Sequence, residues 1–228
     1  MTYTVSDIFD FFLPRTCVSC KSNLNSSEEI ICSKCKSLLL PVEDVKIQSE
    51  FDRKFKSENL ISGFTSLYIF FDKTPIQDLL HELKYNGKFR TGTYIGKEIY
   101  NYQFEKLLNW QIDFIIPVPL YPLKKAERGY NQSYFIAKGI AGKLKIPVSD
   151  GLLLRNRHTQ SQTKLNFEQR KQNMEAAFSI KKFDKIKEKN ILLIDDVITT
   201  GATISECARE LKNNGAGDIY AASASLTN

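Results

Sequence analysis

Two adjacent aspartates placed directly after a short apolar run are the residues of this sequence best suited to bind a polar ligand. Asp195 and Asp196 follow Ile191–Ile194. This run is too short for a helix and too uniformly apolar for a half-exposed strand, so it predicts a central strand of a parallel sheet. Ligands of open α/β sheets bind outside the carboxyl ends of the strands. We therefore expect the two carboxylates to face a pocket, where they would suit two hydroxyls of a ribose.

A short polar segment after the aspartates has the composition of a phosphate-binding turn. It consists of Thr199, Thr200, Gly201, Ala202 and Thr203. These residues supply hydroxyls, a glycine free to adopt positive φ, and successive backbone N–H groups. The segment leads into a helix N-terminus, which favours phosphate, and we expect a side chain at Gly201 to block the phosphate's approach. A simple turn with a capping threonine is the plainer alternative, but it accounts for Thr203 alone. The apolar stripe of the helix is Ile204, Cys207, Ala208 and Leu211.

A second polar segment follows another predicted strand, Ile112–Val118. It is rich in proline and carries the cations Lys124, Lys125 and Arg128, with Gly129 directly after them. A stiff cationic loop at the carboxyl end of a strand is suited to a pyrophosphate. A basic loop exposed to solvent is the alternative.

Lys84 lies near the end of a helix that the sequence predicts to open at Thr74 and Pro75 and to stop at Gly87. A cation in this position would serve either an anionic ligand or the helix dipole.

A polar stretch without a clear apolar period runs from about residue 156 to residue 175. It contains Gln162, Arg170 and Asn173. A stretch of this length inside a compact domain favours a functional flap over idle coil. A disordered surface loop is the alternative.

Four of the five cysteines form two pairs, Cys17 with Cys20 and Cys32 with Cys35. Two C-x-x-C knuckles in a short stretch are typical of a structural zinc site with four thiolate ligands. Two disulfides are the alternative, but they require an oxidising compartment. We therefore expect structural Zn²⁺. Cys207 falls on an apolar helix face and is expected in the core.

Composition sets broad limits on the protein class. No apolar stretch approaches the length of a membrane span, so we expect no membrane insertion. The first 13 residues show an amphipathic pattern that Asp7 and Asp10 interrupt, and no basic residue precedes it. This predicts a packed helix in place of a signal peptide, with a membrane-surface or partner-docking helix as the alternative. The net charge of +6 indicates attraction to anions without choosing among nucleotides, polyphosphates and nucleic acid.

These elements predict three parts along the chain. Residues 1–42 hold the amphipathic helix and the cysteine ribbon, residues 43–58 form a charged connector, and residues 59–228 form an α/β domain. The expected fold is a central parallel sheet flanked by helices, with a small zinc ribbon at the N-terminus.

The segment from Ile191 to Thr203 closely resembles the signature of type I phosphoribosyltransferases, which bind phosphoribosyl pyrophosphate (PRPP). The whole chain resembles the ComF family, which includes ComFC and GntX-like proteins. Three further features carry this resemblance: the cysteine ribbon, the segment from His81 to Gly87, and the segment from Arg128 to Gln132. Gln162, Leu165, Arg170 and Asn173 add to it.

The resemblance implies a type I phosphoribosyltransferase fold and assigns roles to residues. Asp195 and Asp196 would hold the ribose, and residues 199–203 would grip the 5′-phosphate. Arg128, Gly129 and Lys84 would lie near the rest of PRPP. Gln162, Arg170 and Asn173 would belong to a mobile cover. It also implies zinc and a cytoplasmic role in taking up single-stranded DNA, together with proteins of the uptake machinery.

Three functions remain open at this point. The first is transfer of ribose 5-phosphate from PRPP to an amine or base, with Asp195, Asp196 and Arg128 in catalytic roles and Mg²⁺ bound with PRPP. In its plain form this is a metabolic phosphoribosyltransferase without a DNA role. The second is a DNA-handling module that keeps the PRPP site, and the two can coexist. The third is a structural partner that docks through the ribbon. The sequence does not identify an acceptor or establish that turnover occurs.

Overall fold

A four-stranded parallel sheet forms the centre of the protein, which we describe from a computed structural model covering residues 15–156, 177–181 and 183–227. The strands lie in the order β1 (Gly63–Ile69), β6 (Ile219–Leu226), β5 (Ile191–Ile198) and β2 (Phe114–Pro117). All three pairings are parallel. A bridge between Ile115 and Val148 extends the sheet beyond β2. The predicted central strand is confirmed as β5, which is paired on both sides.

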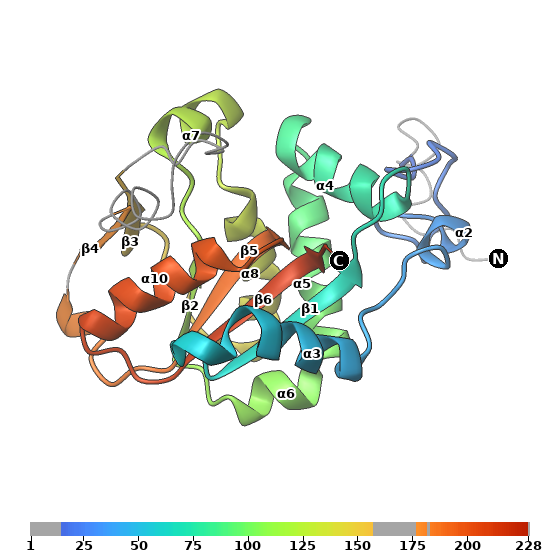
Figure 1. Ribbon diagram of the computed structural model, residues 1–228. Helices are drawn as coiled ribbons and strands as arrows, with labels where there is room; N and C mark the ends of the chain where they lie inside the picture. Colours follow the sequence, from blue (N-terminus) through green and yellow to red (C-terminus); the bar gives the residue numbers. More distant parts are fainter. Residues whose placement is uncertain (1–14, 157–176, 182, 228) are drawn as a thin grey trace, which may run out of the picture.

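Two helices cover one face of the sheet (Figure 1). They are α3 (Asp44–Lys54) and α10 (Ala202–Asn213). Ile204, Cys207 and Leu211 of α10 pack with Ile191 and Leu193 of β5 in one apolar cluster. The predicted stripe of this helix and the buried position of Cys207 are therefore confirmed. The antiparallel pair β3 (Leu153–Arg155) and β4 (Phe178–Ile180) joins the same cluster.

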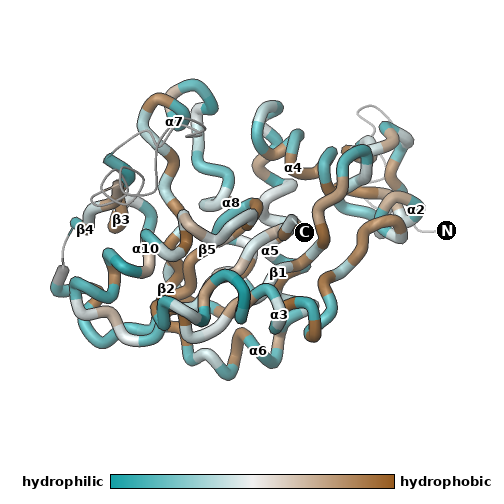
Figure 2. Tube along the Cα trace, viewed as in Figure 1, coloured by the Kyte–Doolittle hydropathy of each residue, from teal (hydrophilic) through white to brown (hydrophobic). Residues whose placement is uncertain are grey.

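The opposite face is covered by α4 (Pro75–Tyr85), α5 (Phe89–Tyr102) and α8 (Gln132–Leu144). Helices α5 and α8 pack very closely because Gly96 of α5 faces Gly139 of α8. A Cβ on Gly139 would lie 2.3 Å from the carbonyl oxygen of Thr93. The short helices α6 (Phe104–Asn109) and α7 (Pro122–Arg128) sit at opposite ends of the molecule (Figure 1). The apolar residues are concentrated in the strands and on the inner sides of the helices (Figure 2).

The cysteine-containing segment docks on the α4 and α5 side of the domain. It holds one short helix, α2 (Ser33–Lys36). Lys21 pairs with Glu82 of α4 at 2.7 Å, and Lys36 pairs with Glu98 of α5 at 2.6 Å. Cys17, Cys32 and Cys35 share one apolar cluster with the residues of these helices, so the ribbon shares a core with the domain.

Helices α5 and α6 are separated at Gln103. One predicted part of the chain differs from what the sequence suggested. Residues 43–58, expected as a connector, form α3 and the 3₁₀ helix η1 (Lys56–Glu58). Ile47 and Phe55 of this stretch are buried in the core. The predicted helix before residue 14 lies outside the described residues. Within the described part of the chain, no helix has the length and apolar character needed to cross a membrane.

Candidate functional site

Asp195 and Asp196 lie in the last part of β5, at the carboxyl edge of the sheet. Asp196 is buried, with 7% of its surface exposed, and Asp195 is half-buried. The backbone N–H of Asp196 donates to Asp195 Oδ1 at 2.8 Å, and the N–H of Val197 donates to Asp196 Oδ1 at 2.8 Å. Each carboxylate is thus fixed by the main chain of the following residue.

The two aspartates mark a change in the alternation of β5. Before them, Ile191 and Leu193 face the α10 side while Ile194 faces the α8 side. After them, Val197 packs on the α8 side and Ile198 on the α10 side. Regular alternation would give the opposite assignment, yet the register with β6 stays constant from Ile191 to Ile198, so no residue is inserted in the ladder.

A hydrogen-bonded chain joins Asp196 to cations on two helices. Lys84 Nζ of α4 lies 2.8 Å from Asp196 Oδ2. Gln132 Nε2 of α8 donates to the same oxygen at 3.2 Å, and its Oε1 accepts from Arg128 of α7 at 2.7 Å. The structure therefore brings Lys84, Arg128 and the acidic pair together.

Asp195 has a different environment. Ser133 Oγ donates to Asp195 Oδ1 at 3.4 Å. Its burial, together with the negative charge of Asp196, raises the pKa of Asp195 to about 8. The two neighbouring carboxyls therefore differ, with Asp196 paired to a cation and Asp195 readily protonated near neutral pH.

The predicted phosphate turn joins β5 to the N-terminus of α10. Thr199 and Thr200 are exposed, and Gly201 is the N-cap residue with φ of +84°. Gly201 has no side chain to cap α10, and the N–H of Ala202 donates a hydrogen bond to Thr200 Oγ1 at 3.4 Å. The helix therefore presents backbone N–H groups that a phosphate could bind.

The space under Gly201 is filled by protein. A Cβ at Gly201 would lie 2.7 Å from Cε1 of Phe55, the residue that follows α3. We expected a side chain at Gly201 to block the phosphate. The structure shows instead that its Cβ would contact Phe55. A substitution would first strain a left-handed backbone and displace Phe55.

A cationic hollow of about 260 Å³ opens between α4 and α7. Its lining residues are Lys84, Tyr85, Lys124, Glu127 and Arg128. The guanidinium of Arg128 lies over the ring of Tyr85, 5.4 Å from its centre. Lys84 lines this hollow and also pairs with Asp196, so the hollow lies next to the acidic pair. Its cations are suited to one anionic group of a ligand whose phosphate binds at the turn.

Some site residues were missed by sequence reasoning, and others cannot be placed. The segment Pro122–Arg128, expected as a stiff loop, is the helix α7, which ends at Gly129. Gln132 belonged to a segment that carried the resemblance but was given no role, and Ser133 was missed, although Asn131 caps α8 and marks its start. Gln162, Arg170 and Asn173 lie outside the described residues.

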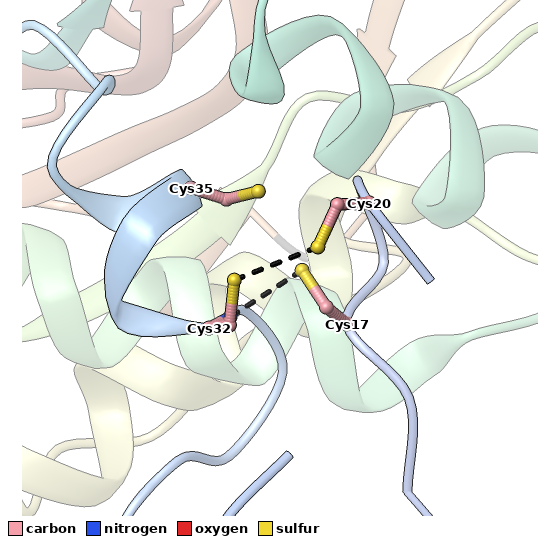
Figure 3. Close-up of side chains that lie close together, drawn as sticks. All are labelled: Cys17, Cys20, Cys32 and Cys35. Carbon is pink, nitrogen blue, oxygen red and sulfur yellow. Dashed lines mark hydrogen bonds between the residues drawn. The ribbon is translucent and has the colours of Figure 1, made fainter. Parts of the chain in front are cut away.

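The four predicted cysteine ligands converge at one point (Figure 3). Their Sγ atoms all lie within 4.8 Å of one another. Cys17 and Cys20 come from one knuckle, and Cys32 and Cys35 come from the start of α2. A hydrogen bond with Ser22 lowers the pKa of Cys20 to about 6, whereas burial raises the pKa of Cys35 to about 12. A bound metal ion would favour the thiolate form of both. The cluster could hold a metal ion.

Comparison with known proteins identifies the class to which this fold and site belong. Residues 131–224 match the family model of the phosphoribosyl transferase domain. This match includes the acidic pair, the phosphate turn and α8, but not the cysteine cluster, α3 or Lys84. The protein therefore contains a phosphoribosyltransferase domain of the type I fold, with a four-cysteine cluster near its N-terminus.

Similarity to three named proteins extends beyond this domain. Competence protein F of Haemophilus influenzae is 25% identical over 224 residues, 93% of this chain and 96% of that protein. Competence protein ComFC of Bacillus subtilis is 27% identical over 207 residues, 88% of this chain and 79% of that protein. DNA utilization protein YhgH of Escherichia coli is 28% identical over 149 residues, 64% of each chain. Over most of its length this chain is therefore similar to proteins of the ComF type.

Proposed function

We propose that the protein binds PRPP at the carboxyl edge of its sheet and acts in the cytoplasm, in ComF-type uptake of single-stranded DNA. One observation supports the binding site above others. Asp196 is joined to Lys84 directly and to Arg128 through Gln132, next to the N-terminus of α10. This arrangement offers acceptors for hydroxyls, donors for one phosphate and cations for a second anionic group.

Each part of PRPP would have its own partners. Asp195 and Asp196 would accept hydrogen bonds from the ribose hydroxyls. The backbone amides of residues 199–203 would hold the 5′-phosphate, with Thr199, Thr200 and Thr203 as hydroxyl donors. Lys84, Arg128 and the N–H of Gly129 would face the pyrophosphate. Mg²⁺ would enter with PRPP and neutralise part of its charge.

Transfer would form a bond from an acceptor nitrogen to C1′ of the ribose and break the bond from C1′ to the pyrophosphate oxygen. Lys84 and Arg128 would stabilise the charge on the departing pyrophosphate. The acceptor's proton would leave to solvent or to Asp195. If turnover occurs without any DNA role, the protein is a metabolic phosphoribosyltransferase.

The cysteine cluster would hold a structural Zn²⁺. Four thiolates complete a tetrahedral site and leave no position for a reactive water, so the ion would stabilise the fold of the ribbon. The close approach of the four Sγ atoms supports this assignment.

A role with DNA is supported by the names of the relatives and by the exposed cations of α7. Lys124 lines the same hollow as Tyr85, and Lys125 is exposed beside it on α7, a pattern suited to the backbone and bases of a single strand. Proteins of the DNA-uptake machinery would then bind the complex of this protein with single-stranded DNA.

Isothermal titration calorimetry tests the proposal directly. We expect saturable binding of PRPP with Mg²⁺, and weaker binding of ribose 5-phosphate or pyrophosphate alone. A panel of amines and bases with a pyrophosphate-release assay then tests turnover. Absence of PRPP binding at millimolar ligand would contradict the proposed site, while binding without pyrophosphate release would favour a ligand-sensing role.

A further inference from the structure

Lys54 is a buried cation at the end of α3, outside the residues that match the phosphoribosyl transferase family model. Only 1% of its side-chain surface is exposed. Its Nζ lies 2.9 Å from Oε2 of Glu50, which is also buried. Burying a charge is costly unless the charge is paired and hydrogen-bonded, so the position of Lys54 requires an explanation.

Glu50 does not need Lys54 as its counter-ion. Arg53 lies 2.6 Å from Glu50 Oε2, and Lys46 lies 3.1 Å from Oε1. Burial alone would raise the pKa of this carboxyl, but hydrogen bonds from Arg53, Lys54 and Lys46 lower it to about 2. Glu50 would therefore stay ionised and paired without Lys54, and the reason for burying Lys54 lies elsewhere.

The second partner of Lys54 is the phosphate turn. Its Nζ donates a hydrogen bond to the carbonyl oxygen of Thr199. Phe55, the next residue, packs under Gly201. Further along, Glu58 of η1 pairs with Arg209 of α10 at 2.9 Å. The segment 54–58 thus contacts the turn and the helix that follows it.

The hydrogen bond to Thr199 determines how the turn presents its amides. In a trans peptide, the carbonyl of one residue and the N–H of the next point in opposite directions. Because the carbonyl of Thr199 is held by Lys54 on the α3 side, the N–H of Thr200 points to the other side. Thr199 and Thr200 are exposed, so a phosphate that reaches the turn from solvent would meet it on the side away from Lys54.

We propose that Lys54 is a positioning residue for PRPP, which orients the Thr199–Thr200 peptide group so that the turn binds the 5′-phosphate. This inference rests on the proposed PRPP site and extends it to a helix outside the matched domain. Lys54 does not contact the ligand, because its side chain is enclosed between Glu50 and the turn.

The test compares two lysines that both pair with Glu50. Lys54→Met keeps the length of the side chain and removes the ammonium. Lys46→Met removes the other lysine of the same helix, which is partly exposed. We expect Lys54→Met to weaken Mg²⁺–PRPP binding about tenfold, which equals about 1.4 kcal/mol. Lys46→Met should stay within about twofold of the wild type, and Lys54→Arg should recover most of the loss.

A second measurement does not depend on PRPP. Hydrogen–deuterium exchange of the free protein should show faster exchange at the amides of Thr200 and Gly201 in Lys54→Met, but not in Lys46→Met. If Lys54→Met does not fold, Lys54→Gln replaces it in both measurements, with the same direction expected.

These outcomes separate the two claims. If wild-type protein fails to bind PRPP but Lys54→Met loosens the turn, the proposed function is wrong, and Lys54 orients the turn without serving PRPP. If wild-type protein binds PRPP and Lys54→Met binds it equally well, the positioning role is overturned. Equal exchange of the turn amides in both variants also overturns it.

Discussion

Lys84 Nζ lies 2.8 Å from Oδ2 of Asp196, so a cation from α4 rests on a buried carboxylate of β5. The pair joins the helix that contacts the cysteine ribbon to the strand that carries the acidic pair. Lys84 remains partly exposed on its other side, with 24% of its side-chain surface accessible. It can therefore hold Asp196 and still meet an anion in the cationic hollow.

The first prediction concerns this pair. Lys84→Met should weaken Mg²⁺–PRPP binding at least about tenfold, because it removes a cation from the ligand and leaves Asp196 without its ion pair. Lys88→Met is the matched control, since Lys88 pairs with Glu82 at 2.8 Å near the same end of α4. Calorimetry measures both, and equal affinities would exclude Lys84 from the site.

The second prediction concerns Asp195 and pH. Its pKa in the folded protein, about 8, lies above the ordinary value of 3.8. Between these values the folded state binds more protons than the unfolded state, so this group's contribution to stability is present at low pH and is lost as pH rises toward 8. Asn cannot ionise, so Asp195→Asn should remove this loss.

Thermal unfolding at pH 5 and pH 8 measures the effect. We expect Asp195→Asn to raise Tm relative to the wild type by at least about 3 °C more at pH 8 than at pH 5, the shift that about 1 kcal/mol produces in a protein of this size. Asp184→Asn, at an exposed acid of η2, should show no such pH dependence. A difference that shrinks with rising pH would contradict the raised pKa.

The third prediction concerns the metal. Cys35→Ser should lose bound zinc, measured by mass spectrometry of the metal content, and should unfold at a lower temperature. A structural zinc commonly contributes on the order of 10 kcal/mol to coupled binding and folding, so the loss should be large. Cys207→Ala is the matched control, because Cys207 is buried in the core far along the chain from the cluster. It should keep one zinc per chain, and metal loss there would refute the assignment.

The sequence predicted the central strand, the turn after it and the cysteine cluster because each is local. Ile191–Ile194, Thr199–Thr203 and the two C-x-x-C pairs are contiguous or nearly so, and their chemistry can be read without knowing what packs around them. The partnership of Lys84 with Asp196 was harder to predict. It depends on how α4 packs on the sheet, and no local sequence pattern predicts this packing.

The sequence of helix α3 contains a helical pattern, but its charge composition led to a different prediction. Ile47, Phe51 and Phe55 recur at every fourth position, which is helical spacing. The many charges between them suggested a connector, yet two of these charges, Glu50 and Lys54, are buried as a pair. Charge composition alone therefore does not identify a solvated segment.

The fourth prediction concerns DNA. Binding of single-stranded oligonucleotides should weaken steeply between 50 and 200 mM salt, as expected for phosphate contacts. The double variant Lys124→Gln with Lys125→Gln should reduce the slope of log affinity against log salt, by about 0.7 for each lost contact. Lys143→Gln, on an exposed lysine at the far end of α8, should leave the slope unchanged. Fluorescence anisotropy gives both slopes, and identical ones would place the DNA elsewhere.

The last prediction concerns Gly201. Gly201→Ala should destabilise the protein for two separable reasons, the strain of a left-handed backbone and the contact of the new Cβ with Phe55. The strain costs about 1–2 kcal/mol. In a Phe55→Leu background the contact is relieved while the strain remains, so Gly201→Ala should then cost less. Gly142→Ala on α8, where a Cβ meets no atom within 4 Å, should be neutral or stabilising. Urea unfolding of the four variants completes the cycle, and an equal cost of Gly201→Ala in both backgrounds would show that Phe55 does not support the turn.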